Sequence, residues 1–137
     1  LNSLLSEPKI IISGTVTTFS TCAGTASAEQ SVTVSGQNLG SSAITVTAPT
    51  GYEVSLSSAS GYAGSISISP VSGTVNSTIV YVRLKSDATN GASGSLTVTS
   101  SGAAQRSIAI GAATVNAQPT ITANGTITNF RVQISQT

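Results

Sequence analysis

The sequence predicts an all-β fold, and three observations support this prediction. Apolar and hydroxylic residues alternate along most of the chain, with the period of two that a half-buried strand requires, whereas the helical period of 3.6 is almost absent. The 12 Val and 12 Ile among the 137 residues are branched side chains that suit a pleated surface. This apolar content also argues against disorder, although 25 Ser and 20 Thr are present.

The expected strands follow one another along the chain, with apolar side chains on one face and hydroxyls on the other. The opening strand covers residues 9–19, and Gly14 within it is interpreted as a bulge or a crossing between two sheets. Residues 78–85 predict a more deeply buried central strand, because four consecutive apolar residues begin at Ile79. The other strands carry the inward-facing sets Val32/Val34, Ile44/Val46, Tyr52/Val54/Leu56, Ile66/Ile68, Leu96/Val98 and Ile108/Ile110.

Turn-forming residues separate these strands at the spacing of about 8 to 12 residues that is typical of a sandwich. The predicted turns are residues 35–38, 49–51, 58–61, 70–73, 87–94 and 100–102. A chain with seven or eight strands at this spacing is expected to form an immunoglobulin-like antiparallel β-sandwich. The chain has one Cys and no Trp, so the Cys and Trp pattern of antibody domains is missing and the prediction concerns architecture only.

The beginning and the end of the chain are similar to each other. Residues 8–19 (PKIIISGTVTTF) and 119–130 (PTITANGTITNF) align without a gap, and the Pro, one Ile, the Gly, two Thr and the Phe coincide. Such self-similarity indicates a repeat array. We therefore expect an N-terminal linker at 1–7, one sandwich repeat at 8–117, and a linker plus the first strand of a truncated repeat at 118–137. Because unpaired strand edges recruit other chains, residues 119–134 are also expected to mediate a strand-paired homo-oligomer.

The composition excludes several functions. The net charge is +1 and the five basic residues are scattered, which argues against nucleic-acid binding. The longest apolar runs have three or four residues, too few for membrane insertion. The chain has no His, and a glycosidase would need two facing carboxylates about 5 to 10 Å apart. We expect no catalytic residue and no cofactor, because each acid lies beside a turn or strand end: Glu7, Glu29, Glu53 and Asp87.

Two further features are interpreted as structural. Residues 87–91 resemble a calcium loop superficially, but calcium requires about 6 to 8 oxygen ligands, so a turn is expected there and no metal site. Cys22 cannot form an internal disulfide, and it is expected to be buried or idle.

Carbohydrate binding is the main alternative to a purely structural role, since secreted sandwiches often hold sugars on aromatic side chains. Phe19 and Tyr52 have the parity of core residues. Tyr62 lies in a glycine-flanked loop and is expected to be the most exposed ring. Tyr81 shares its strand face with Arg83, or is a corner tyrosine that bonds back to the chain. Tyr62, Tyr81 and Arg83 are thus the candidate ligand contacts.

Three stretches carry a family resemblance. Residues 19–39 (FSTCAGTASAEQSVTVSGQNL), 44–55 (ITVTAPTGYEVS) and 79–84 (IVYVRL) resemble the Ig-like repeats of large secreted and surface proteins of Bacteroidetes. The likeness covers about residues 8–115. It implies export by the type IX route, a secreted or cell-surface location, neighbouring nuclease, glycosidase, adhesive or sorting domains, and no catalytic residues.

The residues and the resemblance together predict a non-catalytic spacer module whose partners are the neighbouring domains of the same polypeptide. The alternative is a carbohydrate-binding or adhesive module that accompanies a secreted polysaccharide-degrading enzyme or an adhesin.

Overall fold

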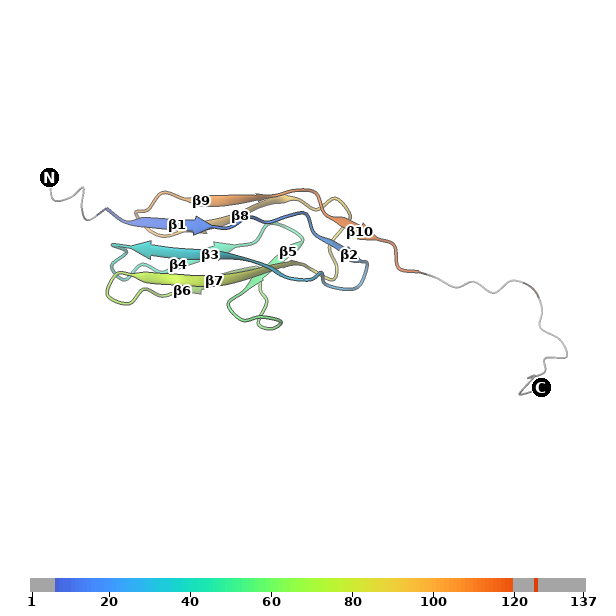
Figure 1. Ribbon diagram of the computed structural model, residues 1–137, viewed down its shortest axis with the longest axis horizontal. Helices are drawn as coiled ribbons and strands as arrows, with labels where there is room; N and C mark the ends of the chain where they lie inside the picture. The colour runs from blue at the N-terminus through green and yellow to red at the C-terminus, as the bar shows by residue number, and fades with distance from the viewer. Residues whose placement is uncertain (1–6, 120–124, 126–137) are drawn as a thin grey trace.

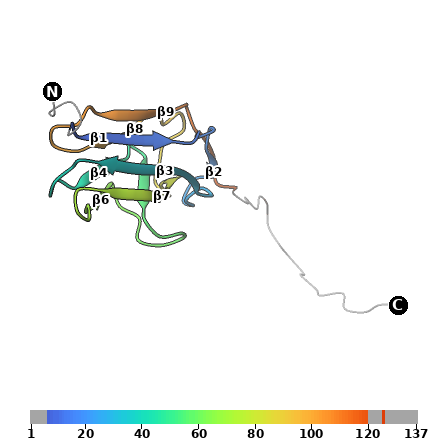
Figure 2. The same cartoon turned by 60° about the vertical axis from the view of Figure 1, so that its left-hand side comes forward.

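The computed structural model describes residues 7–119 and residue 125, and this part of the chain is a β-sandwich without helices (Figure 1). Two antiparallel four-stranded sheets form the two layers, and a parallel pair of short strands lies at one end (Figure 2). The first sheet contains, in spatial order, β1 (Lys9–Ser13), β3 (Gln30–Gln37), β7 (Val75–Leu84) and β5 (Tyr52–Ser55). The second contains β6 (Ser65–Ile68), β4 (Ile44–Thr47), β8 (Gly94–Thr99) and β9 (Arg106–Ile110). The parallel pair is β2 (Ser20–Cys22) and β10 (Thr114–Asn116).

The predicted immunoglobulin-like antiparallel sandwich is confirmed. The orders β1-β3-β7-β5 and β4-β8-β9 are those of the two sheets of an immunoglobulin constant domain, and β6 extends the second sheet beyond β4. The structure has ten strands rather than seven or eight. Two short strands account for the difference: β2 follows the segment that was predicted as the opening strand, and β10 follows β9 after a short break.

The core lies between the two sheets and contains most of the inward-facing residues that the alternation predicts. Ile66, Ile68 and Ile108 are only partly buried and pack against it. Each fully buried Val, Leu or Ile side chain stabilises the fold by roughly 1.5–3 kcal/mol relative to exposure. Leu56 is an exception, because its side chain is 43% exposed. The strand β5 ends at Ser55, so the chain has left the sheet before the parity of Leu56 can place it in the core. The largest buried apolar side chains are Ile10, Ile44, Leu84, Leu96, Val34, Val46, Val54, Val80, Val82 and Val98.

The prediction of a deeply buried strand at residues 78–85 is only partly right. β7 is central in its sheet, between β3 and β5, and Val80 and Val82 are fully buried. Ile79, however, is 50% exposed, and Tyr81 is half-buried. A sandwich has two layers, so one face of every strand remains turned away from the core, and a continuous apolar run cannot be buried on both sides.

Two glycines differ in role from the sequence interpretation. β1 ends at Ser13, and Gly14 follows with a φ of +113°, so residues 9–19 are not one strand. The interpretation as a crossing is right, since the chain leaves the first sheet here and resumes as β2 against β10. Gly36 was expected in a turn at 35–38 but lies inside β3, at a bulge opposite β7, and the following turn begins at Asn38.

The core leaves little room for a side chain at Gly36. An added Cβ would lie 2.7 Å from Leu39 Cδ1 and 3.0 Å from Ile44 Cδ1, both buried in the core.

The predicted strand of a second repeat, together with the predicted oligomer contact at 119–134, lies outside the described residues except for Pro119 and Gly125.

Candidate functional site

The three candidate ligand residues lie near one another on the outer face of the first sheet. Tyr81 and Arg83 point outward from β7, and Arg83 lies opposite Glu53 of β5 in the strand register. Arg83 Nε donates a hydrogen bond to Glu53 Oε2 over 2.7 Å. The loop between β5 and β6 folds back over this pair, so that the ring centroid of Tyr62 lies 3.9 Å from the guanidinium carbon of Arg83. The structure therefore brings Tyr62 and Arg83 into contact, with Tyr81 on the same strand face.

Glu29, which no sequence pattern identified, holds this loop from the other side. Its carboxylate, just before β3, accepts hydrogen bonds from the hydroxyls of Ser58 and Tyr62 and from the Ala59 N–H, the last over 3.0 Å. These bonds, led by that from Ser58, lower the pKa of the Glu29 carboxyl. Burial and the bond to Glu29 raise the pKa of the Tyr62 hydroxyl. We call Glu29, Glu53, Tyr62 and Arg83 the loop clamp.

The loop clamp is suited to holding a loop. Arg83 covers one face of the Tyr62 ring and Glu29 engages its hydroxyl, so only part of this half-buried ring is left for a ligand. The lowered pKa of Glu29 is opposite to the raised pKa that a general acid needs. The partners of Glu29 lie 29 to 33 positions further along the chain, which explains why no local motif revealed it.

Phe19 and Tyr52 are core residues, as their parity predicts. The hydrogen bond from a tyrosine hydroxyl back to the chain, which was considered for Tyr81, is made by Tyr52. Phe19 and Tyr52 are buried and pack edge to face, with ring centroids 5.4 Å apart. The Tyr52 hydroxyl donates to the Ala92 carbonyl over 2.9 Å, with the Gly111 carbonyl at 3.4 Å. Burial raises the pKa of this hydroxyl. Within residues 7–119 the structure gives no hydrogen bond to the hydroxyl of Tyr81, so its role as a corner tyrosine is not supported.

Residues 86–91, which we call the exit loop, form turns, as the sequence predicts. The Asn90 side-chain oxygen accepts a hydrogen bond from the Val115 N–H over 2.8 Å, which fastens the loop to β10. Asp87 lies 3.7 Å from the Lys85 ammonium group. Among the described side chains, no group of three His, Cys, Asp or Glu is placed to hold a metal ion.

Cys22 is exposed at the end of β2, so of the two expected states, buried or idle, the structure excludes burial. In the part of the chain that the structure describes, no helix has the length and apolar character needed to cross a membrane.

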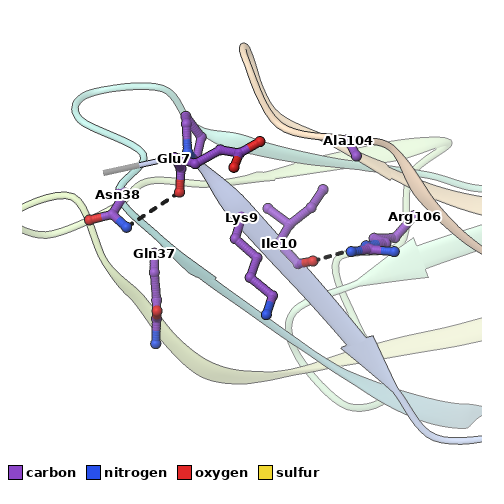
Figure 3. A pocket seen from close by; sticks show the side chains of 8 residues that line it. Glu7, Lys9, Ile10, Gln37, Asn38, Ala104 and Arg106 are labelled. Carbon is purple, nitrogen blue, oxygen red and sulfur yellow. Dashed lines mark hydrogen bonds between the residues drawn. The ribbon is translucent and has the colours of Figure 1, made fainter. Parts of the chain in front are cut away.

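Two hollows lie at the two ends of the sandwich. The larger, which we call the entry hollow, has a volume of about 520 Å³ and lies between the start of β1, the end of β3 and the start of β9 (Figure 3). Asn38 Nδ2 donates to the Glu7 carbonyl over 3.3 Å, and Arg106 Nε donates to the Ile10 carbonyl over 3.2 Å (Figure 3). Lys9 also lines this hollow. The smaller one, of about 300 Å³, lies at the other end beside the exit loop.

Comparisons with protein-family models, with curated proteins and with solved structures give no match. The function is therefore inferred from the residues and geometry of this chain.

Proposed function

We propose that this chain is a non-catalytic spacer repeat of a secreted or cell-surface multidomain protein, with the neighbouring domains of the same polypeptide as its partners. The observation that carries the proposal is the path of the chain through the sandwich. The chain enters β1 at one end of the long axis and leaves β10 at the other (Figure 1). A domain joined after β10 therefore continues the line of the sandwich and lengthens the protein.

The repeat in the sequence supports the same role. Pro119 stands at the repeat position of Pro8, and Gly125, with a φ of +97°, stands at that of Gly14, with a φ of +113°. Only two residues separate the end of β10 from Pro119. Three extended residue steps span about 10 Å at most. Successive copies would thus follow each other closely.

The parallel pair β2 and β10 lies on the path between the two ends of the domain. The Ala23 N–H donates to the Asn116 carbonyl over 2.8 Å, and the Thr114 N–H donates to the Phe19 carbonyl over 3.0 Å. Tension at the ends pulls β2 and β10 in opposite directions along their length. Parallel strands pulled in this way must break their hydrogen bonds together rather than in sequence, which suits a module that bears load.

Single-molecule force measurements test this role. Pulling the chain by its two ends should unfold the sandwich in one step at high force. The chain from β1 to β10 measures roughly 360–390 Å when fully extended, and the length released is this value less the span of the folded domain. Cys22, the one cysteine, allows a matched control. Pulling between Cys22 and the C-terminus peels β10 from its register partner β2 one bond at a time, and should need much less force. Equal forces in the two geometries would refute the proposal.

The carbohydrate-binding or adhesive alternative has less support. The Tyr62 ring is engaged within the loop clamp, and Tyr81 is a single half-buried ring. We expect no retention of the chain on a panel of soluble and insoluble polysaccharides. Retention that is lost in Tyr81→Ala would favour the alternative over the spacer role.

A further inference from the structure

We propose that the free edge of β6 is a docking surface for a second copy of this chain, whose own β6 pairs with it antiparallel about a two-fold axis. The second sheet of one copy then continues into the second sheet of the other, and each copy offers the same surface to its partner. The residues of β6, its backbone groups and the state of the other sheet edges support this pairing.

The other three edges of the two main sheets, those of β1, β5 and β9, are charged or covered. β9 lies beside β1 (Figure 2), and Arg106 of β9 reaches across, where its Nε donates to the Ile10 carbonyl over 3.2 Å. β5 is covered by its own loop, because the Val54 N–H donates to the Ala63 carbonyl over 2.8 Å and the Ala63 N–H donates to the Val54 carbonyl over 2.9 Å. Charged residues and covering segments of this kind keep a sheet edge from pairing with other chains.

The strand β6 has neither protection. It is the edge of the second sheet opposite β9, and the two lie on opposite sides of the sandwich (Figures 1 and 2). The chain has no charged residue between Glu53 and Arg83, a stretch that contains all of β6, and the neighbouring strand β4 has none either. Pro70 lies beyond the end of β6, so no proline interrupts the strand. The residue types of β6 therefore leave this edge able to pair.

The outward backbone groups of β6 are those of Ser65 and Ser67. The Ala48 N–H donates to the Gly64 carbonyl over 2.9 Å, and the register between β4 and β6 continues from this pair. Backbone groups alternate between the two sides of an antiparallel strand, so residues 66 and 68 also bond to β4, and Ser65 and Ser67 direct their N–H and C=O groups away from it. Within residues 7–119, the structure gives these outward groups no partner.

The sequence of β6, Ser-Ile-Ser-Ile, is complementary to itself when Ser67 lies on the two-fold axis. Ser67 then stands opposite Ser67 of the second copy, and Ile66 opposite its Ile68. Opposite residues of a sheet point to the same face, so hydroxyls meet on the outer face and isoleucines meet on the core face. Ile66 and Ile68 are only partly buried in the single chain, so the pairing covers apolar surface that the edge leaves accessible.

The pairing also fixes how the two copies lie. The strands run along the long axis of the sandwich (Figure 1), so antiparallel pairing places the copies side by side and pointing in opposite directions. Successive copies in a spacer array point the same way, so the contact joins different polypeptides. This consequence alone rests on the proposed function. Each copy contributes one short strand, so we expect weak association, with a Kd on the order of 0.1–1 mM.

Amide hydrogen exchange, measured by NMR on the full chain, tests the contact. A reductant keeps the exposed thiol of Cys22 from forming a disulfide. When the concentration rises from about 20 µM to about 2 mM, most copies become paired, and the exchange of the Ser65 and Ser67 amides should slow at least twofold. The amides of Ile66 and Ile68, which bond to β4, should exchange slowly at both concentrations.

Substitutions on the axis make the test specific. Ser67→Lys places two like charges opposite each other and should abolish association in sedimentation equilibrium, as should Ser67→Glu. An equimolar mixture of these two variants should associate at least as strongly as the original chain, because opposite charges then face each other. Ser95→Lys, exposed on β8 and two strands away from the edge, is the matched control and should leave association unchanged.

Several results would overturn the proposal: a chain that stays monomeric at about 2 mM, association without slower exchange at Ser65 and Ser67, no recovery in the mixture, or equal effects of Ser67→Lys and Ser95→Lys. The exchange measurement uses the original chain, so it decides the question even if a variant fails to fold. Pulling a single chain does not depend on contact between copies. A chain that passes the force test and stays monomeric therefore refutes this pairing and keeps the spacer role.

Discussion

Replacing Tyr52 with phenylalanine removes one hydroxyl from the core and leaves the ring in place. The side chain is 2% exposed, and its ring packs edge to face on Phe19. The hydroxyl joins β5 to the loop before β8 through the Ala92 carbonyl, and it lies near the Gly111 carbonyl after β9. Tyr52→Phe therefore isolates one cross-layer hydrogen bond, with the apolar packing preserved.

The expected loss follows from the bonding of the acceptor. The Ala92 carbonyl also accepts a hydrogen bond from the Ala113 N–H over 2.9 Å, so Tyr52→Phe leaves it with a partner. The free energy of unfolding should then fall by the net value of one hydrogen bond, about 1 kcal/mol and within roughly 0.5–1.5 kcal/mol. For a domain of this size the corresponding fall in Tm is about 3–5 °C.

Urea and thermal unfolding followed by far-UV circular dichroism measure this loss, with Tyr81→Phe as the matched control. Tyr81 is half-buried on the outer face, and its hydroxyl has no hydrogen bond among the residues described. The control should change the free energy of unfolding by less than about 0.5 kcal/mol. The reasoning is refuted if Tyr52→Phe and Tyr81→Phe lower the free energy of unfolding equally, or if Tyr52→Phe leaves it unchanged.

Three other substitutions have expected outcomes in the same unfolding measurements. Gly36→Ala should lower the free energy of unfolding by about 1–3 kcal/mol, because the added methyl group overpacks the core. Gly64→Ala, with open space around its Cβ position, should leave the free energy of unfolding nearly unchanged, and equal losses in the two variants would contradict the steric account. Val80→Thr places a hydroxyl in the core and should lower the free energy of unfolding by about 1–3 kcal/mol. Ile79→Thr, at a half-exposed position, should change the free energy of unfolding by less than about 0.5 kcal/mol. A larger loss in Ile79→Thr than in Val80→Thr would contradict the placement of Val80 on the inner face of β7 and Ile79 on the outer face. Glu29→Gln should lower stability at neutral pH. The folded pKa of Glu29 lies below its ordinary value of 4.5, so the stability that the carboxylate contributes is present above the unfolded pKa and is lost as the pH falls through the folded pKa. The free energies of unfolding of the original chain and of Glu29→Gln should therefore converge in acid. A difference between them that stays constant down to the lowest pH would refute the role of Glu29 in the loop clamp.

Much of the fold could be predicted because strand formation and burial leave a local pattern. Val34, Ile44 and Leu96 are buried as their alternation predicts, since neighbouring residues of a strand face opposite sides of the sheet. The prediction failed where a strand ended or a face was not covered. Leu56 keeps the inward parity but lies beyond the end of β5, and Ile79 lies in an apolar run but on the outer face.

The candidate site was predictable only in part. Tyr81 and Arg83 share a face because they are two residues apart on one strand, and the sequence shows this. The contact of Tyr62 with Arg83 depends on how a loop folds back over the sheet. Glu29 entered the site only through partners about thirty residues away, which no local pattern records.

The sequence by itself determined the all-β class, the core residues of most strands, and the similarity of residues 8–19 to 119–130, because each of these is written in short-range spacing of residue types. The tertiary structure alone decided which strands share a sheet, which tyrosine hydroxyl crosses the core, and that Glu7, Lys9 and Arg106 gather at the end opposite Asp87. These features depend on contacts between segments far apart in the chain. Their free energy is gained only when the two sheets close on one another, so no single stretch of sequence contains them.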